Sequence, residues 1–292
     1  MRRIAFLGLG RMGLGMAGRL IDAGYDVAVY NRNNNKAKQL VSRGARVAAS
    51  PRTAVDGAEA VIAMVADDAA SRAVWLGDEG ALAAVTPEAF AIECSTLSHG
   101  WVKELAGAAS ARGVRYIDCP VTGLPDMAAR GALTLLAGTD VHDLKTAEPY
   151  LAPLSERIIH FGPIGCGTAY KLMINLMGAV QIAAAAEGMA IAERAGLDLR
   201  TVADAIALGQ AASPQVVRNT ERMANGDHDH TVNFTPALRL KDAEYAVSLA
   251  HDLGLSAPFG HTACDMFRAL CELGHHDSNE SKVIEVARRN LL

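Results

Sequence analysis

The sequence predicts an α/β protein, in which an N-terminal domain with a mainly parallel sheet is followed by an all-helical C-terminal domain. Three observations lead to this prediction. Short apolar runs alternate with helical patterns through the first half of the chain. No convincing strand pattern follows Gly167. Residues 168–195 read as one helix, and at about 1.5 Å per residue its length is enough to join two domains.

The first elements follow the order strand, turn, helix, strand. Residues 3–7 form the kind of apolar run that fills a buried parallel strand. Glycines follow at once, and residues 14–23 then read as a helix that ends before Gly24. A second strand is expected at 27–30.

The same alternation continues, and it predicts βαβ units. Further strands are expected at 60–65, 90–94, 114–118, 133–137 and 157–160. Beyond the long helix, further helices are expected at 199–208, 213–224, 236–253, 258–273 and 281–288. We therefore predict a first domain over residues 1–163 and a second over residues 164–292.

Composition narrows the possible functions. Half of the 292 residues are hydrophobic, and a net charge of −4 is spread along the chain, so nucleic acid is not an expected partner. No window offers about 20 uninterrupted apolar residues, so no membrane span is expected. The five cysteines form no CxxC pair, which favours reduced thiols in a cytoplasmic protein and no metal site. Asp227–His230 is interpreted as a solvated loop rather than as metal ligands.

A glycine-rich loop predicts a dinucleotide site. Gly8, Gly10 and Gly13 form G-x-G-x-x-G between a strand and a helix, with Leu9, Arg11 and Met12 between them. The glycines permit a tight turn and let the backbone approach a pyrophosphate, which the start of the helix then binds. The alternative is a glycine turn that only packs. This context favours a Rossmann-type nucleotide-binding domain.

The end of the second strand indicates which nucleotide is preferred. NAD-binding proteins commonly place Asp or Glu there, but this chain has Asn31, Arg32 and Asn33. A carboxylate would repel a 2′-phosphate, whereas Arg32 can pair with one. We therefore expect NADP in preference to NAD, with NAD possible. The alternative is that Arg32 simply points to solvent, as Lys36 and Lys38 are expected to do.

Polar and small residues share one face of the long predicted helix. Gly167, Lys171, Asn175 and Gly178 follow one another at spacings of four, four and three residues. The glycines leave room for a ligand against the helix backbone. A buried lysine is costly unless it is used, although a lysine that reaches the surface would fit the spacing equally well.

Four separated segments resemble the β-hydroxyacid dehydrogenase family, which is related to 6-phosphogluconate dehydrogenase. They are Gly8–Gly13, Asp118–Gly123 with Gly131–Thr134, Gly165–Asn175, and Lys241–Asp242 preceded by Phe234. The resemblance covers essentially the whole chain. It implies an NAD(P)-dependent oxidoreductase that acts on a small β-hydroxy acid or semialdehyde bearing a carboxylate.

The resemblance also implies roles for individual residues. Lys171 would be the general acid and base, with Asn175 holding the substrate oxygen or orienting Lys171. The substrate carboxylate would lie at Thr122, Gly123 and Leu124. The implied cofactor contacts beyond the glycine loop come from Met64, Val65, Ala66, Thr96 and Lys241. Lys241 is also a candidate for lowering the pKa of Lys171, if the fold brings the two together.

Two departures from the family pattern leave the substrate open. Thr122 stands where the family usually has Ser, and Leu124 stands where it usually has a second Gly. Two alternatives stay open: an imine reductase, although these usually lack lysine at this position, and an NADPH-binding sensor without catalysis. Apolar helices in the second half further suggest a homodimer or homotetramer.

Overall fold

The computed structural model describes residues 2–289, and they form two compact units. The first unit ends at Lys171, and the second starts at Leu172. This division falls inside the long helix α8 (Cys166–Arg194), eight residues beyond the boundary expected from the sequence at residue 163. Each unit has its own hydrophobic core.

A single sheet of the described strands organises the first unit, with the order β3-β2-β1-β4-β5-β6-β8-β7 and β9 against β8. The strands are β1 (Arg3–Leu7), β2 (Asp26–Tyr30), β3 (Arg46–Val47), β4 (Ala60–Ala63), β5 (Phe90–Glu93), β6 (Arg115–Asp118), β7 (Val121–Thr122), β8 (Leu133–Gly138) and β9 (Ser155–Gly162). Strands β1 to β6 run parallel, so the loops that follow them meet at one edge of the sheet.

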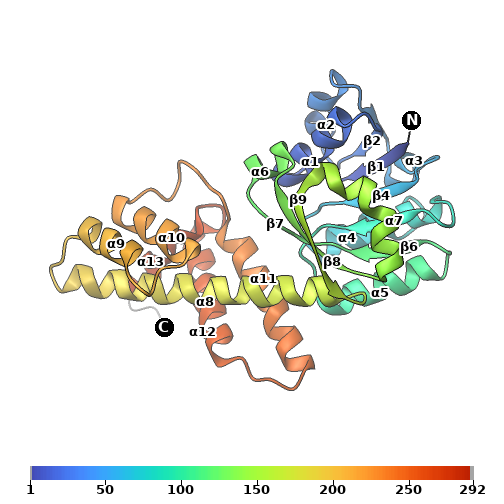
Figure 1. Ribbon diagram of the computed structural model, residues 1–292. Coiled ribbons are helices and arrows are strands. Elements are labelled where there is room, and N and C mark those ends of the chain that lie inside the picture. Colours follow the sequence, from blue (N-terminus) through green and yellow to red (C-terminus); the bar gives the residue numbers. More distant parts are fainter. Residues whose placement is uncertain (1, 290–292) are drawn as a thin grey trace. The chain divides into compact units, whose positions relative to one another are not determined.

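Helices cover both faces of this sheet (Figure 1). Side chains of α1 (Arg11–Asp22), α2 (Asn34–Val41), α6 (Pro125–Arg130) and α7 (Val141–Leu151) pack in one core. Side chains of α3 (Pro51–Ala54), α4 (Asp68–Trp75) and α5 (His99–Ser110) pack in the core of the opposite face. The expected mainly parallel sheet is confirmed.

The sheet departs from the expected pattern where β6 leads into β8. Strand β8 pairs antiparallel with β6 and β7, although it runs parallel to β9. Only the six-residue helix α6 lies between β7 and β8, and this connection is too short for a parallel crossover. The two-residue strands β3 and β7 were not expected, because such short segments carry no periodicity.

The secondary structure of the second unit, over its described residues, consists of helices and no strands. After α8 come α9 (Leu199–Leu208), α10 (Pro214–Asn225), α11 (Pro236–Asp252), α12 (Pro258–Leu270) and α13 (Ile284–Arg289). A π-turn at Cys271–His275 ends the helix that was expected to reach residue 273, and Gly274 there has a φ of 84°. The expected helix at 281–288 is a 3₁₀ turn at Glu280–Val283 followed by α13.

Helix α8 is the one described helix that is long and apolar enough to cross a membrane by length and composition alone. Its residues Ala179, Ile182 and Ala186 lie in the core of the second unit. A core helix of this kind passes the same test, so the finding is weak evidence for a span.

The interpretation of Asp227–His230 as a solvated loop is wrong for one residue. His228 is buried, and its Nδ1 lies 2.9 Å from the Ser281 hydroxyl. Burial lowers the pKa of His228, which favours the neutral ring. Asp229 pairs with Lys282, and His230 is exposed. Among the described residues no His, Cys, Asp and Glu side chains gather as metal ligands.

Candidate active site

The glycine-rich loop is a turn that only glycine fits at two positions. Gly8 has a φ of +98°, and a Cβ there would lie 2.4 Å from the carbonyl oxygen of Met64. A Cβ at Gly13 would lie 2.0 Å from the carbonyl oxygen of Gly8. The first glycine therefore brings the loop against the end of β4, and the third brings helix α1 against the turn.

Gly10 is different, because a Cβ placed on it would meet no atom within 4 Å. It precedes α1, and no side chain caps the start of that helix. The first turn of a helix has backbone N–H groups without intrahelical partners, and these suit an anion. The open space at Gly10 and the uncapped helix start fit the pyrophosphate of a dinucleotide.

Asn31 ties the end of β2 to this loop. Its Oδ1 accepts a 2.8 Å hydrogen bond from the Leu9 N–H, and its Nδ2 donates to the carbonyl of Asn33 at 2.8 Å. Asn33 in turn caps α2 through the N–H of Asn35. Arg32, between them, is exposed. The amide of Asn31 thus shapes the backbone and leaves Arg32 facing solvent beside the loop.

Two further loops of the expected cofactor site are joined by a buried carboxyl group that the sequence analysis did not single out. Glu93, at the end of β5, accepts hydrogen bonds from Ser71, Trp75 and the N–H of Ser95 at 2.7–3.0 Å. The Ser95 hydroxyl accepts the N–H of Val65 at 2.8 Å. Burial raises the pKa of Glu93, and its hydrogen bonds oppose that shift.

This chain of bonds places the loop with Met64, Val65 and Ala66 beside the loop with Thr96. A second link joins the same loops, since the N–H and hydroxyl of Ser98 donate to Asp68 at 2.9 and 2.6 Å. A glutamate inside an apolar strand could have been noticed in the sequence, because a carboxyl group is rarely buried without hydrogen-bond or ion-pair partners.

The expected substrate segment runs along β8. Thr122 pairs with Thr134, and its side chain is exposed. Gly123 has a φ of 143°, and a Cβ there would lie 2.6 Å from Leu133 Cδ2. Leu124 has an ordinary extended backbone (φ −104°, ψ 168°) and precedes α6. The leucine is accommodated without backbone strain.

The first residue of that segment, Asp118, holds the start of the helix that carries Lys171. Its Oδ1 accepts the N–H of Gly165 at 2.7 Å, and its Oδ2 accepts the N–H of Thr168 at 2.8 Å. Asp118 is fully buried; burial raises its pKa, and these two backbone bonds oppose the rise. Lys171, three residues after Thr168, is partly exposed.

Asn175 lies in the second unit, and both its side chain and its backbone carbonyl form hydrogen bonds. Its Nδ2 donates to Asp242 Oδ2 at 2.6 Å, and its backbone carbonyl accepts from Arg239 at 3.3 Å. Lys241 lies 2.8 Å from the other oxygen of Asp242. The Lys241–Asp242 segment therefore contacts Asn175 through Asp242, and Lys241 is paired with that carboxylate.

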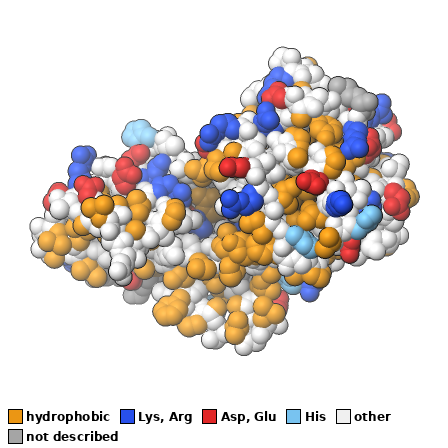
Figure 2. Space-filling view, viewed as in Figure 1, with side chains coloured by type: hydrophobic (Ala, Val, Ile, Leu, Met, Phe, Trp, Pro, Cys, Tyr) orange, Lys and Arg blue, Asp and Glu red, His pale blue; other side chains and the backbone are white. Residues whose placement is uncertain are grey.

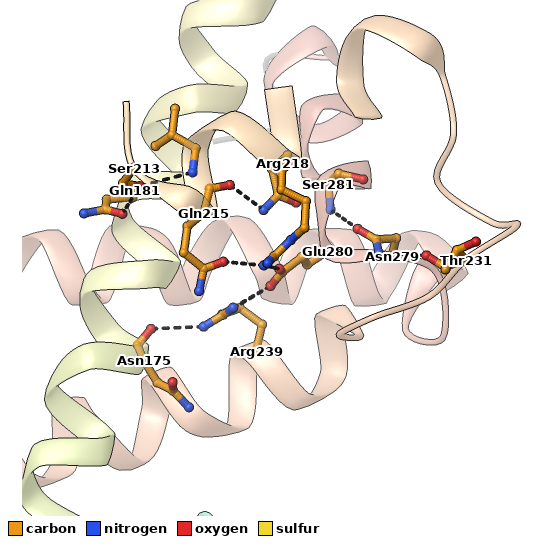
Figure 3. A network of polar contacts seen from close by, with 12 residues as sticks. Asn175, Gln181, Ser213, Gln215, Arg218, Thr231, Arg239, Asn279, Glu280 and Ser281 are labelled. Carbon is orange, nitrogen blue, oxygen red and sulfur yellow. Dashed lines mark hydrogen bonds and ion pairs between the residues drawn. The ribbon is translucent and has the colours of Figure 1, made fainter. Parts of the chain in front are cut away.

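A buried ion pair extends this cluster (Figure 3). Arg239 is bound to Glu280 at 2.7 Å, and both side chains are almost completely buried. Arg218 lies 3.5 Å from the other oxygen of Glu280 and donates to Gln215 at 2.7 Å. The guanidinium of Arg239 also lies over the Phe234 ring, with 4.5 Å to its centroid. Nothing in the sequence pattern pointed to Glu280.

Comparisons with known proteins identify the family. Residues 3–162 match the NAD binding domain of 6-phosphogluconate dehydrogenase, and residues 165–287 match the family described as NAD-binding of NADP-dependent 3-hydroxyisobutyrate dehydrogenase. This chain belongs to the β-hydroxyacid dehydrogenase family. It is an NAD(P)-dependent oxidoreductase of the 3-hydroxyisobutyrate dehydrogenase type.

Three similar proteins illustrate the extent of the match. An NAD-dependent L-serine dehydrogenase of Pseudomonas aeruginosa is 32% identical, with 97% of each chain covered. The structure of Mycobacterium tuberculosis 3-hydroxyisobutyrate dehydrogenase with L-serine is 32% identical, with a TM-score of 0.89 and 99% of each chain covered. Psf3 in complex with NADP+ and 2-OPP is 25% identical, with a TM-score of 0.85, and 97% of this chain and 99% of Psf3 are covered.

Proposed function

We propose that this β-hydroxyacid dehydrogenase prefers NADP(H) and uses Lys171 as the general acid and base in the interconversion of a small semialdehyde and its β-hydroxy acid. The observation that carries the proposal is the position of Lys171. It lies one turn into a helix whose start is bound to Asp118, the first residue of the expected substrate segment.

A bound nicotinamide supplies or accepts the hydride. In the reduction, the Lys171 ammonium would stabilise the negative charge that grows on the substrate oxygen and deliver a proton to it. In the oxidation, neutral Lys171 would remove the hydroxyl proton. Asn175, held by Asp242, would bind the substrate or orient Lys171, and Thr122 with the backbone at Gly123 and Leu124 would bind the carboxylate.

The cofactor residues follow from the loops. The backbone of Gly8, Leu9, Gly10, Arg11, Met12 and Gly13 would bind the pyrophosphate. Met64, Val65, Ala66 and Thr96 would face the rest of the nucleotide, on loops that Glu93 fixes. We also propose Lys241 as a cofactor contact, because the family resemblance implies that role.

The preference for NADP(H) rests on the end of β2. No carboxylate occurs between Asn31 and Lys36 to repel a 2′-phosphate, and Arg32 is exposed beside the loop. Asn31 is committed to Leu9, so Asn33 and Arg32 remain for the phosphate. Arg32→Ala should weaken NADPH binding by about 10- to 100-fold and NADH binding much less, since a charge-assisted bond contributes about 1.5–3 kcal/mol. Equal losses for both cofactors in a binding titration would remove the argument.

Lys171→Ala tests the reaction. We expect kcat to fall by more than about 100-fold while the Kd for NADPH stays nearly unchanged. The assay should follow NADPH and NADH oxidation with glyoxylate, succinic semialdehyde and tartronate semialdehyde. A Lys171→Ala variant with full activity would refute the role of the lysine. NADPH binding without turnover of any carbonyl would favour the sensor, and turnover of imines alone would favour the imine reductase.

The surface of the second unit supports the further proposal of a homodimer or homotetramer, and the cysteine pattern supports a cytoplasmic location. Hydrophobic side chains gather around the connection between α11 and α12 (Figure 2), where Leu253, Leu255 and Phe259 are each more than 60% exposed. Beside Phe259 lies an apolar hollow of about 390 Å³, lined by Leu176, Met177 and Val180 of α8. Exposed apolar surface of this kind is common at protein interfaces.

A further inference from the structure

We propose that Asp118 is a positioning residue for Lys171: its carboxylate fixes the start of α8 on the sheet, and so sets where the lysine amine can act. This inference rests on the proposed role of Lys171. It assigns Asp118 a part in catalysis without contact with the substrate.

The cap on α8 comes from a distant part of the chain. Helices α4, α5 and α7 are capped by the residue directly before them, respectively Asp67, Ser98 and Asp140. Asp118 instead precedes Gly165 by 47 residues and Thr168 by 50. A local cap moves with its helix, whereas this cap belongs to β6 and holds the helix to the sheet.

The backbone atoms around the Asp118 carboxylate are closely packed. Asp118 pairs in register with Gly138 of β8, and a Cβ on Gly138 would lie 2.4 Å from Asp118 Oδ1 and 2.8 Å from the Gly167 nitrogen. A Cβ on Gly167 would lie 2.1 Å from the carbonyl of Leu136. The first turn of α8 therefore packs directly on the backbone of β8, in one position.

The position of Lys171 depends on this packing. It follows Gly167 by four residues, so the two share a face of α8, and long helical side chains lean toward the N-terminal end of their helix. The lysine stem therefore lies over the turn that Asp118 binds. A displacement of about 1 Å in a reacting group can cost about 100-fold in rate, so a helix start that shifts would lower turnover.

The test is Asp118→Asn, alone and combined with Lys171→Ala. Asn keeps one accepting oxygen and turns an N–H₂ group toward an N–H donor, so one of the two bonds is lost. We expect kcat to fall about 10- to 100-fold, with KM and the Kd for NADPH within about threefold of their starting values. In the Lys171→Ala background the same change should alter the residual kcat by less than about twofold, because no amine is left to position.

A purely structural role gives a different result. If Asp118→Asn lowers kcat equally with and without Lys171, or leaves kcat unchanged, the inference is overturned. If Lys171→Ala itself keeps full activity, the proposed function fails first, and the two failures are thus distinguishable. Asp143→Asn is the matched control, since Asp143 pairs with Arg115 of the same strand at 2.8 Å and should leave kcat unchanged.

A second variant serves if Asp118→Asn does not fold. Gly138→Ala keeps the carboxylate but presses a methyl group between it and the Gly167 nitrogen. It should lower kcat with an intact Lys171 and have little effect in the Lys171→Ala background. Faster hydrogen exchange at the amides of Gly165 and Thr168 should accompany the loss in both variants, and unchanged exchange would contradict the proposed cause.

Discussion

Buried carboxyl groups are satisfied in different ways in the two units. In the first unit, Glu93 and Asp118 accept hydrogen bonds from neutral groups: a hydroxyl, an indole and backbone amides. In the second unit, Glu280 is bound to two arginines, and Asp242 pairs with Lys241. The first arrangement fixes the backbone of loops and of the start of α8, and the pairs of Glu280 join helical segments through their side chains.

The difference follows from the hydrogen-bond donors that lie near the carboxyl groups in each unit. Glu93 and Asp118 end neighbouring strands and are partners in register, so both face the loops that leave the sheet. Loops offer unpaired backbone N–H groups, and a carboxylate accepts these readily. Beyond their first turn, helices have used their N–H groups internally, so Glu280 and Asp242 pair with charged side chains instead.

The largest effect is expected when the ion pair of the second unit is broken. Glu280→Gln leaves the buried Arg239 without its counter-charge, and breaking a buried pair costs about 3–5 kcal/mol of stability. The loss should appear as a lower free energy of unfolding in urea. Glu244→Gln is the control, because Glu244 forms an exposed pair with Arg268 and should contribute less than about 1 kcal/mol. Equal losses for both variants would show that the buried pair contributes no more to the free energy of unfolding than the exposed pair.

A smaller effect is expected from Glu93→Gln in the first unit. Gln offers one accepting oxygen instead of two, so the bonds to Ser95 or to Trp75 and Ser71 weaken. The cofactor loops should loosen, and the Kd for NADPH should rise about 10-fold, the equivalent of about 1.4 kcal/mol. Glu104→Gln, at an exposed pair with Arg72, should leave the Kd unchanged. Unaltered NADPH binding in Glu93→Gln would mean that the loops keep their positions without the carboxylate.

The smallest effect concerns pH. Because burial raises the pKa of Glu93 in the folded protein, the protonated form is favoured on folding. That contribution is complete below the unfolded pKa of about 4.3, and it is lost as the pH rises through the folded pKa. The Tm of the wild-type protein relative to Glu93→Gln should therefore fall as the pH rises from about 4. A difference in Tm that stays constant up to pH 8 would show that Glu93 ionises as it does in the unfolded chain.

Much of the fold followed from periodicity and glycine placement. Apart from the two-residue β3, the strands of the parallel part and helices such as 199–208 were predicted to within a few residues, because buried runs and amphipathic patterns are local signals. The strand at 133–137 was predicted as well, but its antiparallel pairing with β6 and β7 was not, since pairing partners are set by connections rather than by composition. The burial of His228 escaped notice for a similar reason, because its partner Ser281 is 53 residues away.

In the candidate site too, local patterns could be predicted from the sequence and long-range contacts could not. The glycine loop, Lys171 and Asn175 could be found from spacing and resemblance. Glu93 and Asp118 act through hydrogen bonds to Ser95 and to the start of α8, and only the folded chain brings those groups together. The sequence shows Glu93 in an apolar strand and Asp118 at the start of a family segment, but it does not show their partners, which the tertiary structure fixes.

Asn31 has a consequence for how cofactor choice could change. Its side chain contributes an oxygen, and a carboxylate at the same place could accept the same bond from Leu9. A single Asn31→Asp exchange would keep the bond from Leu9 but lose the bond from Nδ2 to the Asn33 carbonyl, and it would add a negative charge that a free ribose hydroxyl tolerates and a phosphate does not. If the proposed preference for NADP(H) holds, a change of cofactor at this position is therefore tied to the backbone at Asn33.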